Sequence, residues 1–346
     1  PRRPSRTFVD LGATMKERIT IVGDGQMGLV MAAAAVEAGA ESVTVWGPFE
    51  ESVASLEATR RSSRLPDWRI PDAVGFASDP GCLVGSSLVM NAIPTQFVRP
   101  VWNRLAPTLA GIPETPVVVS TAKGLEIGSG LLPTDVIHEI VPSASVSVLS
   151  GPTIATELAR RQPAVMVAAS AEGSLAARVH RAFGTPWLRI YESRDPTGVE
   201  LAGGLKNVIA LAAGICDGLD LGFNAKSALL ARGLAEMTRI GVALGADART
   251  FSGIAGVGDL ATTCFSPDGR NRACGEAIAR GASLDEYLAG QACVVEGVPT
   301  VESVLARAAD RGIELPIMQA VKAVLLEGRD PAEAIRELMG RPSGEE

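Results

Sequence analysis

A glycine-rich turn between an apolar strand and an apolar helix constrains the fold of this chain most. Residues 18–23 (RITIVG) are rich in β-branched side chains and end in glycine, which predicts a short buried strand. Residues 26–38 have the composition of a buried helix, and Gly39 is suited to end it. Residues 42–46 (SVTVW) predict a second strand. The intervening turn, residues 23–28 (GDGQMG), is therefore a GxGxxG pattern inside a βαβ unit.

The three glycines of this pattern suit a turn that binds a dinucleotide. Gly23 permits a tight turn, Gly25 lets a pyrophosphate approach the backbone, and Gly28 lets the helix pack closely on the strand. The free N–H groups and the positive dipole end of the helix favour phosphate groups. The pattern predicts NAD or NADP as the cofactor, and an ordinary glycine-rich loop is the alternative.

The end of the second strand normally distinguishes NAD from NADP. A carboxylate there binds the ribose hydroxyl groups of NAD, whereas an arginine binds the 2′-phosphate of NADP. This chain continues with residues 46–51 (WGPFEE). Glu50 or Glu51 can serve as the carboxylate that selects NAD, or both can face solvent in the first turn of a helix. The sequence leaves the choice of cofactor open.

Alternating strands and helices predict the fold class of the first half. Further buried strands are expected at residues 87–93, 116–121, 145–150, 164–169 and 187–191, and a helix at residues 50–61. This alternation is typical of an α/β fold with a Rossmann-like, doubly wound and mostly parallel sheet.

Strand patterns fade after about residue 193, where apolar residues begin to recur at helical spacing. Long helices are expected at residues 197–213 and 224–244, and residues 299–309 and 316–339 are expected to be helical too. We therefore expect a flexible extension over residues 1–15, a dinucleotide-binding domain over 16–193, and an all-α substrate and catalytic domain over 194–346.

Scarce residue types exclude several kinds of site. The 2 histidines, His138 and His180, cannot build a three-histidine zinc site and argue against a histidine-centred catalytic relay. The 5 cysteines form no CxxC pair and are typical of reduced thiols in a cytoplasmic protein, so no metal site is expected. A net charge of −7 and only 4% aromatic residues argue against nucleic-acid binding. The sequence contains no unbroken apolar run of the ~18 residues that span a membrane, so no transmembrane helix is expected.

Two segments place polar residues where predicted strands end. Lys123 follows the strand over residues 116–121, and ligands of open α/β sheets bind beyond such ends. Lys123 can face a cofactor or substrate, or it can extend over the surface. Thr153 follows the strand over residues 145–150 and can cap a helix that has Glu157 in its first turn. The free N–H groups of that turn can also face a ligand.

A lysine inside an apolar helix is the strongest candidate for proton transfer. Lys206 follows Gly203 and Gly204, and each glycine in a helix interior costs roughly 1 kcal/mol relative to alanine. Their presence suggests that another group approaches the helix backbone closely. Burial lowers the pKa of a lysine, which suits general acid–base catalysis in a chain where histidine is scarce.

A downstream glycine-rich segment adds a carboxylate and an anion-binding pair. Asp259 stands in residues 256–260 (GVGDL) and can orient Lys206 or stabilise its charge. Arg270 offers a planar guanidinium to a phosphate or carboxylate, and Asn271 adds a further donor. A solvated loop is the alternative for this segment.

These segments, taken together and in order, resemble the soluble, bacterial-type NAD(P)-dependent glycerol-3-phosphate dehydrogenases. The resemblance covers roughly residues 18–340. Its most specific stretches are residues 123–126 (KGLE), 150–152 (SGP), 205–207 (LKN), 224–226 (NAK), 256–260 (GVGDL), 270–272 (RNR) and 295–298 (VEGV). It implies reversible hydride transfer between a nicotinamide and C2 of glycerol 3-phosphate or dihydroxyacetone phosphate, in a cytoplasmic homodimer that supplies the glycerophospholipid backbone.

The resemblance also implies roles for individual residues. Lys206 would be the catalytic acid and base, with Lys123 and Asp259 in the same catalytic group. The residues that match substrate-binding positions are Lys123, Gly151, Thr153, Lys206, Asn207, Asp259, Thr263, Arg270 and Asn271, the last two at the phosphate. The residues that match cofactor-binding positions are Gly23, Gly25, Gln26, Met27, Gly28, Lys123, Ala155, Arg270, Val294 and Glu296.

The chain departs from the family pattern at three places. Gln26 and Met27 stand where bacterial members usually carry Ser-Trp, and Pro48 stands where an arginine or histidine often meets the 2′-phosphate. Gly269 stands where a serine usually precedes the Arg-Asn pair, which removes one substrate hydrogen bond. The alternatives are therefore a reductase of another small phosphorylated or carboxylated ketone, such as a relative of the ketopantoate reductases or opine dehydrogenases, and a non-catalytic sensor that binds a dinucleotide.

Overall fold

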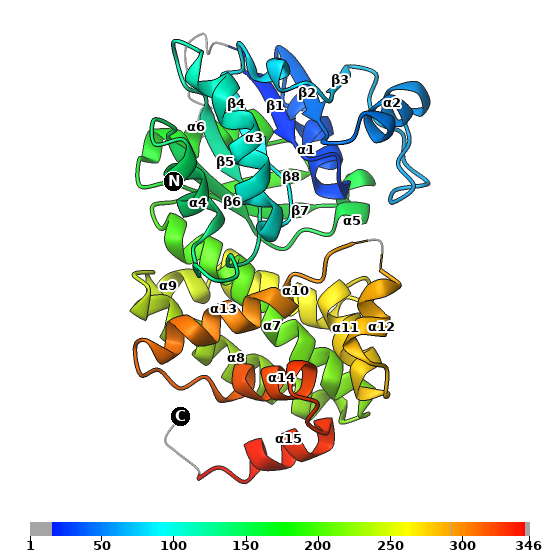
Figure 1. Cartoon of the computed structure of the whole chain (residues 1–346), viewed down its shortest axis with the longest axis vertical. Helices are drawn as coiled ribbons and strands as arrows, with labels where there is room; N and C mark the ends of the chain where they lie inside the picture. The colour runs from blue at the N-terminus through cyan, green and yellow to red at the C-terminus, as the bar shows by residue number, and fades with distance from the viewer. Residues whose placement is uncertain (1–15, 292, 343–346) are drawn as a thin grey trace, which may run out of the picture.

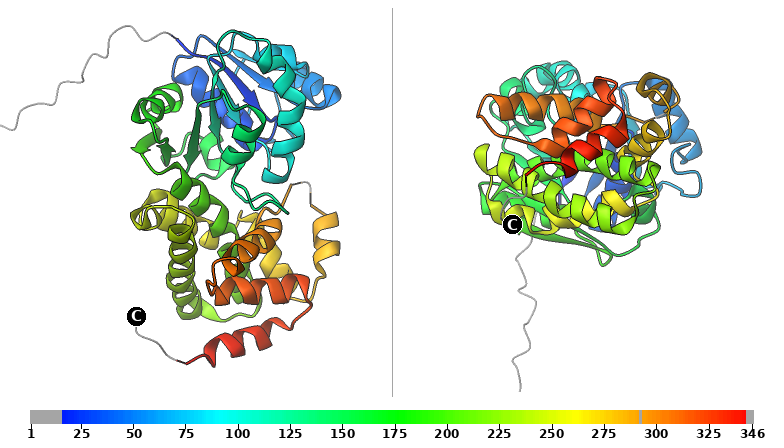
Figure 2. Two further views of the ribbon diagram at one scale, coloured as in Figure 1. Left: turned by 60° about the vertical axis from the view of Figure 1, so that its left-hand side comes forward. Right: turned by 90° about the horizontal axis from the view of Figure 1, so that it is seen from below.

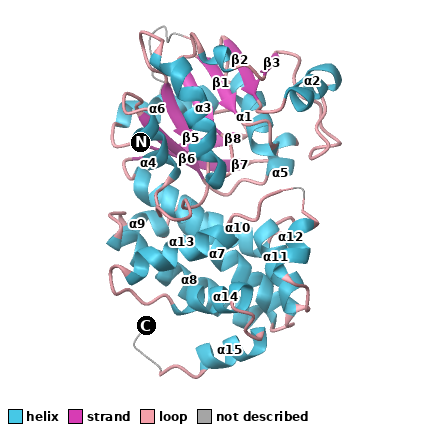
Figure 3. Cartoon of the chain, viewed as in Figure 1, coloured by secondary structure: helices cyan, strands magenta, loops and turns pink. Residues whose placement is uncertain are grey.

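The chain folds into two domains with different architectures. The computed structural model describes residues 16–291 and 293–342. Figure 1 shows an α/β domain above a helical domain, and Figure 3 places the strands in the upper part. This arrangement confirms the predicted fold class. The extension expected over residues 1–15 lies outside the described residues.

One sheet runs through the upper domain. Among the described residues it has eight strands in the order β3-β2-β1-β4-β5-β6-β7-β8. The strands are β1 (Arg18–Val22), β2 (Ser42–Trp46), β3 (Val74–Ala77), β4 (Leu88–Asn91), β5 (Val117–Ser120), β6 (Val146–Ser150), β7 (Ala164–Ala169) and β8 (Leu188–Ser193). Neighbouring strands run parallel except β6 and β7, which are antiparallel. The strand order reverses between β1 and β4, and ligands bind beyond the carboxyl ends of strands at such a reversal.

Side chains at alternate strand positions pack into two apolar cores, one on each face of this sheet. Ile19 and Ile21 of β1 belong to one core, whereas Val22 belongs to the other together with Trp102. The helices that cover the sheet are α1 (Gln26–Glu37), α2 (Glu50–Thr59), α3 (Val98–Ala110), α4 (Pro133–Ile140), α5 (Ala155–Ala159) and α6 (Gly173–Phe183), with the short turns η1 (Pro80–Leu83) and η2 (Thr95–Phe97).

A long helix, α7 (Pro196–Gly218), forms the centre of the lower domain. The elements that follow it are α8 (Gly222–Ala243), α9 (Ala248–Phe251), η3 (Ile254–Gly258), α10 (Asp259–Phe265), α11 (Arg270–Ala279), α12 (Leu284–Ala289), α13 (Gly297–Ala309), α14 (Pro316–Leu326) and α15 (Pro331–Met339). Figure 2 shows α15, in red, at the end of the molecule remote from the sheet. α7 is long and apolar enough to cross a membrane, but 94% of its most apolar stretch is buried inside the fold, as in the core helix of a globular domain.

β3 and the last two helices depart from the sequence expectations. β3 is missing from the predicted strands because it has only four residues, contains Gly75 and lies at the edge of the sheet. The single helix expected over residues 316–339 is two helices, α14 and α15. Pro331 starts the second helix, and the Asp330 side chain caps it by accepting a hydrogen bond from Glu333 N.

Candidate active site

The glycine-rich turn has the open backbone that a phosphate group needs. Gly23 has a φ of +125°, and a Cβ there would lie 2.7 Å from the Ala92 carbonyl oxygen. A Cβ on Gly28 would lie 2.0 Å from the Gly23 carbonyl oxygen, so neither position accepts a side chain. A Cβ on Gly25 would meet Arg64 Nη1 at 3.9 Å, and no side chain caps the start of α1. The N–H groups there can therefore receive a pyrophosphate, and the turn fits a dinucleotide.

The two residues that replace Ser-Trp in this turn use their side chains within the protein. Gln26 Nε2 donates a hydrogen bond to the Arg64 carbonyl oxygen at 2.6 Å. Met27 packs against the core on one face of the sheet. At these two positions the backbone N–H groups are the part suited to a phosphate.

Three charged side chains from three separate elements meet where the domains join. Lys123 follows β5, Lys206 lies inside α7, and Asp259 is the first residue of α10. Lys206 Nζ lies 2.8 Å from Asp259 Oδ1, and Lys123 Nζ lies 2.7 Å from Asp259 Oδ2. Lys123 Nζ also donates to the Gly151 carbonyl oxygen at 3.0 Å. The structure thus brings together the residues that the resemblance places in one catalytic group.

Gly203 and Gly204 let α7 lie directly against the turn that carries Lys123. A Cβ on Gly203 would lie 2.8 Å from Ser150 Oγ and 3.4 Å from Lys123 Cγ. A Cβ on Gly204 would lie 3.1 Å from Gly124 Cα. The close approach expected from these two glycines is the approach of the β5 turn to the helix.

Asp259 is held by an unusual backbone segment. The turn before it, η3, is π-helical, a conformation that occurs often at functional sites. A Cβ on Gly256 would lie 2.0 Å from the Phe251 carbonyl oxygen, so this turn packs backbone against backbone. Asp259 is only 1% exposed, and its ion pairs are therefore little screened by water.

Two cations share one carboxylate at this centre. Burial lowers the pKa of Lys123 to about 8; Asp259 opposes this shift, while the positive charges of Lys206 and Arg270 add to it. The cluster is therefore positive in net charge inside a protein whose overall charge is −7. A local excess of positive charge attracts a small anion.

A chain of side-chain amides connects the Lys123 turn to α11 and α13. Asn207 Nδ2 donates to the Lys123 carbonyl oxygen at 3.1 Å, and Asn271 Nδ2 donates to Asn207 Oδ1 at 3.0 Å. Asn271 Oδ1 accepts a hydrogen bond from Gly297 N at 2.9 Å. These bonds hold the start of α11, where Arg270 is the first residue, next to the lysine cluster.

The segment before α13 carries the predicted cofactor residues Val294 and Glu296. The Val294 carbonyl oxygen accepts a hydrogen bond from Arg270 Nη1 at 3.3 Å. Glu296 Oε1 accepts one from Thr95 N, in the sheet domain, at 3.0 Å. Burial raises the pKa of Glu296 to about 7. Glu296 Oε2, Thr95 Oγ1 and Ser150 Oγ are buried and have no hydrogen-bond partner among the described residues.

Thr95 is a functional candidate that sequence reasoning missed, and Ser150 is one that it included only in residues 150–152 (SGP), without a role. Thr95 opens η2 in the connection after β4, and Ser150 is the last residue of β6. Hydroxyl residues are common at such places for turn and cap reasons, so their type alone carries no signal. Buried polar atoms without a protein partner are the atoms that a ligand can satisfy. Their position beyond the carboxyl ends of the strands is the signal that can find them.

The turn after β6 corrects one expectation. α5 begins at Ala155, with Ile154 before it and no side-chain cap. Thr153 Oγ1 instead donates to the Gly151 carbonyl oxygen at 3.1 Å, so the predicted cap is wrong. Gly151 has a φ of +146°, and the chain completes this sharp turn before the helix begins.

The remaining predicted positions lie as follows. Thr263 is buried on α10, one helical turn after Asp259. A Cβ on Gly269 would lie 2.8 Å from the Thr263 carbonyl oxygen, so this backbone has no room for the serine usual in the family. Glu50 and Glu51 are exposed in the first turn of α2, which favours the solvent-facing interpretation.

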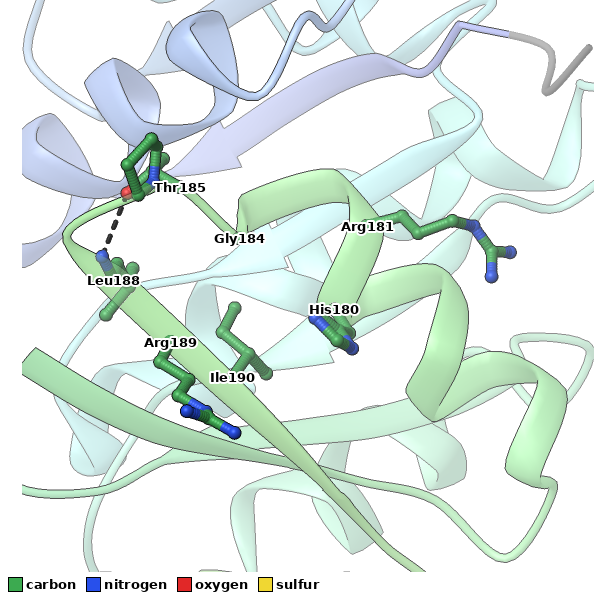
Figure 4. A pocket seen from close by; sticks show the side chains of 8 residues that line it. His180, Arg181, Gly184, Thr185, Leu188, Arg189 and Ile190 are labelled. Atoms are coloured by element: carbon green, nitrogen blue, oxygen red, sulfur yellow. Dashed lines mark hydrogen bonds between the residues drawn. The ribbon is translucent and has the colours of Figure 1, made fainter. Parts of the chain in front are cut away.

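A surface hollow of about 430 Å³ lies away from these residues, between the end of α6 and β8 (Figure 4). Its lining residues are His180, Arg181, Gly184, Thr185, Pro186, Leu188, Arg189 and Ile190. His180 Nδ1 lies 2.9 Å from Glu192 Oε1. The hollow lies at the C-terminal end of α6, and the negative end of the helix dipole there disfavours anions. The hollow contains none of the predicted site residues, and no cluster of three or more His, Cys, Asp or Glu that could hold a metal occurs in the described part of the chain.

Comparison with known proteins finds relatives that span both domains. The family profile described as NAD-dependent glycerol-3-phosphate dehydrogenase N-terminus matches residues 18–176, and its C-terminus counterpart matches residues 195–336. A glycerol-3-phosphate dehydrogenase (NAD(P)+) from Koribacter versatilis is 41% identical over 332 residues, which cover 94% of this chain and 98% of the relative. One from Frankia casuarinae is 42% identical over 333 residues, which cover 95% and 98%.

A solved structure supports the same relationship. The crystal structure of glycerol-3-phosphate dehydrogenase from Coxiella burnetii superposes with a TM-score of 0.89 at 31% sequence identity. The superposition covers 94% of this chain and 99% of that one.

Proposed function

The chain belongs to the family of NAD-dependent glycerol-3-phosphate dehydrogenases, and from this premise we propose how its site residues divide the reaction between them. The enzyme is an oxidoreductase that interconverts dihydroxyacetone phosphate and glycerol 3-phosphate with NAD or NADP. Lys206 transfers the proton, and the sheet domain holds the cofactor. One observation carries this assignment: Lys206 and Lys123 contact opposite oxygens of the buried Asp259 carboxylate.

Reduction of the substrate develops negative charge on its C2 oxygen. A nicotinamide cofactor held by the sheet domain would supply the hydride to C2. Lys206 donates a proton to the oxygen, and Asp259 holds the Lys206 ammonium in a fixed position. Lys123, held by the same carboxylate, adds a second positive charge that stabilises the developing oxyanion. In the reverse direction Lys206 accepts the proton.

The substrate phosphate binds at the start of α11. Arg270 supplies a planar guanidinium, and the first N–H groups of α11 carry no side-chain cap. Asn271 and Asn207 keep this helix start next to Lys123 through their amide hydrogen bonds. Binding energy from the phosphate, which does not react, orients the carbonyl toward Lys206.

Substitution of Arg270 tests the phosphate contact. Arg270→Ala is expected to raise KM for dihydroxyacetone phosphate about 10- to 100-fold, because a hydrogen bond to a charged group contributes about 1.5–3 kcal/mol. With dihydroxyacetone, which lacks the phosphate, KM should barely change. The matched control is Arg280→Ala, directly after the last residue of the same helix, where an exposed arginine pairs with Glu276 at 2.8 Å. An unchanged KM for the phosphorylated substrate in Arg270→Ala would rule out the contact.

The pKa of Lys123 predicts an alkaline loss of activity. Because the pKa of this lysine is lowered to about 8, its positive charge is present below that pH and is lost as pH rises through it. We expect kcat/KM for dihydroxyacetone phosphate to fall above about pH 8 for this reason. Lys123→Arg keeps the charge, so its profile should stay flat through this range although its rate is lower. The same fall in the arginine variant would assign the titration to another group.

The cytoplasmic location and the homodimer that the resemblance implies stay predictions. Size-exclusion chromatography with light scattering tests the homodimer directly.

A further inference from the structure

Asp24, the residue between the first two glycines of the turn, directs its carboxylate toward the end of β2. Ser52 Oγ, in the first turn of α2, donates to Asp24 Oδ2 at 2.7 Å. A Cβ on Gly47, the residue after β2, would lie 3.0 Å from the same Oδ2 atom. Gly23 N donates to the Trp46 carbonyl oxygen at 2.9 Å, which fixes the turn against the last residue of this strand. Figure 1 shows β1, β2 and α2 on the same side of the sheet domain.

In a dinucleotide-binding fold, the end of β2 lies next to the ribose of the cofactor. A carboxylate at the end of the second strand binds the ribose hydroxyl groups, whereas a cation there receives a 2′-phosphate. In this chain the strand is followed by Gly47 and Pro48, whose side chains cannot form such bonds. Glu50 and Glu51 are exposed on α2. Of the three atoms nearest to a Cβ on Gly47, two belong to the Asp24 carboxyl group.

From this geometry, and resting on the proposed dehydrogenase function, we propose that Asp24 is the residue that selects NAD(H) over NADP(H). Ser52 orients the carboxylate and uses one of its roughly four lone-pair sites, so others are available to accept hydrogen bonds from ribose hydroxyl groups. A 2′-phosphate at the same position carries a charge of about −1.5 to −2 and is repelled by the carboxylate. The NAD-selecting carboxylate thus comes from the glycine-rich turn instead of the strand end.

Arg104 is a cation near the end of β2 that would oppose this selection. Arg104 Nη1 donates to the Pro48 carbonyl oxygen at 3.4 Å, and its guanidinium lies 5.2 Å from the centre of the Trp46 ring. If this arginine, and not Asp24, dominated the site, the enzyme would prefer the 2′-phosphorylated cofactor. The two residues therefore predict opposite preferences, and one binding experiment separates them.

The experiment measures binding without turnover. Calorimetry gives the Kd of ADP-ribose and of 2′-phospho-ADP-ribose for the full-length wild type, Asp24→Asn and Arg104→Ala, and fluorescence titration does the same for NADH and NADPH. We expect the wild type to bind the unphosphorylated compound at least about 30-fold more tightly, which equals about 2 kcal/mol. Asp24→Asn keeps the shape of the side chain and removes its charge, and it should reduce this ratio to below about threefold. The matched control is Glu51→Gln, which should leave the ratio unchanged.

Three results would overturn the proposal. The first is a wild type that binds the 2′-phosphorylated compounds as tightly as the unphosphorylated ones, particularly if Arg104→Ala then weakens binding of the 2′-phosphorylated compounds. The second is an unchanged ratio in both Asp24→Asn and Asp24→Ser, with lowered thermal stability, which would make Asp24 only a link between the turn and α2. The third is a wild type that binds no dinucleotide at all, and this result alone would also remove the proposed dehydrogenase function.

Discussion

Replacing Lys206 with alanine is expected to lower kcat for dihydroxyacetone phosphate reduction by about 10²- to 10⁴-fold, the usual contribution of a positioned general acid. When the Lys206 ammonium group is absent, the C2 oxygen of the substrate has to take its proton from water. Cofactor affinity should survive, because the glycine-rich turn and α1 belong to the other domain. Stopped-flow absorbance of the reduced cofactor measures the rate, and fluorescence titration measures cofactor binding.

Lys226 supplies a matched control for this substitution. Lys226 and Lys206 are both 7% exposed, both lie on long helices, and Lys226 Nζ contacts a carboxylate, Asp217, at 2.6 Å. Lys226→Ala should lower stability but keep kcat within about tenfold, because this lysine has no part in proton transfer. Near-wild-type turnover in Lys206→Ala would end the role assigned to Lys206. Equal losses in both variants would point to general damage to the helical domain.

Replacing Asp259 with asparagine should produce both a catalytic and a structural loss. The substitution leaves the Lys206 and Lys123 ammonium groups without the carboxylate they share, and removing one partner of a buried ion pair costs about 3–5 kcal/mol. We expect urea denaturation to show a loss of this size and kcat to fall more than about 10²-fold. Because Asp259 raises the pKa of Lys123, the alkaline fall in kcat/KM should move to lower pH.

Asp217 allows the structural part of this loss to be separated. Like Asp259, it joins two cations, with Lys226 Nζ at 2.6 Å from Oδ1 and Arg272 Nη1 at 2.7 Å from Oδ2. Asp217→Asn should therefore destabilise the helical domain without moving the pH profile. A folded Asp259→Asn enzyme with wild-type kcat and an unmoved pH profile would contradict the shared-carboxylate mechanism.

The parts of the fold that follow from local pattern were predictable from the sequence. The unit β1-α1-β2 has an apolar strand, a glycine-rich turn and an apolar helix in direct succession, so its identity depends on neighbouring residues alone. β3 escaped prediction because its four residues include Gly75 and its pairing with β2 supplies the stability that its own sequence lacks. The break between α14 and α15 falls at the polar residues 327–330 (EGRD), where the Asp330 cap and Pro331 start a new helix.

The site was predictable in its residue types and less so in its connections. Gly203 and Gly204 indicate that another group approaches α7 closely, but the sequence does not show that this group is the turn with Lys123. Thr95 and Ser150 gain their significance from burial, which is a property of the assembled domains. The sequence does not single out Asp24 as a specificity residue, because the pattern directs attention to the strand end, whereas the Asp24 carboxylate reaches Ser52 of α2 from the glycine-rich turn.

The most direct test of the central claim is the oxidation of NADH and NADPH by the purified full chain with three ketones: dihydroxyacetone phosphate, dihydroxyacetone and ketopantoate. The cluster of Lys123, Lys206 and Asp259, with Arg270 beside it, predicts substrate-dependent oxidation with dihydroxyacetone phosphate. Its kcat/KM should exceed the value for dihydroxyacetone by about 10³-fold or more, because the unphosphorylated compound leaves the anion-binding groups unpaired. Tight cofactor binding without oxidation by any ketone, or faster oxidation with ketopantoate, would contradict the assigned chemistry.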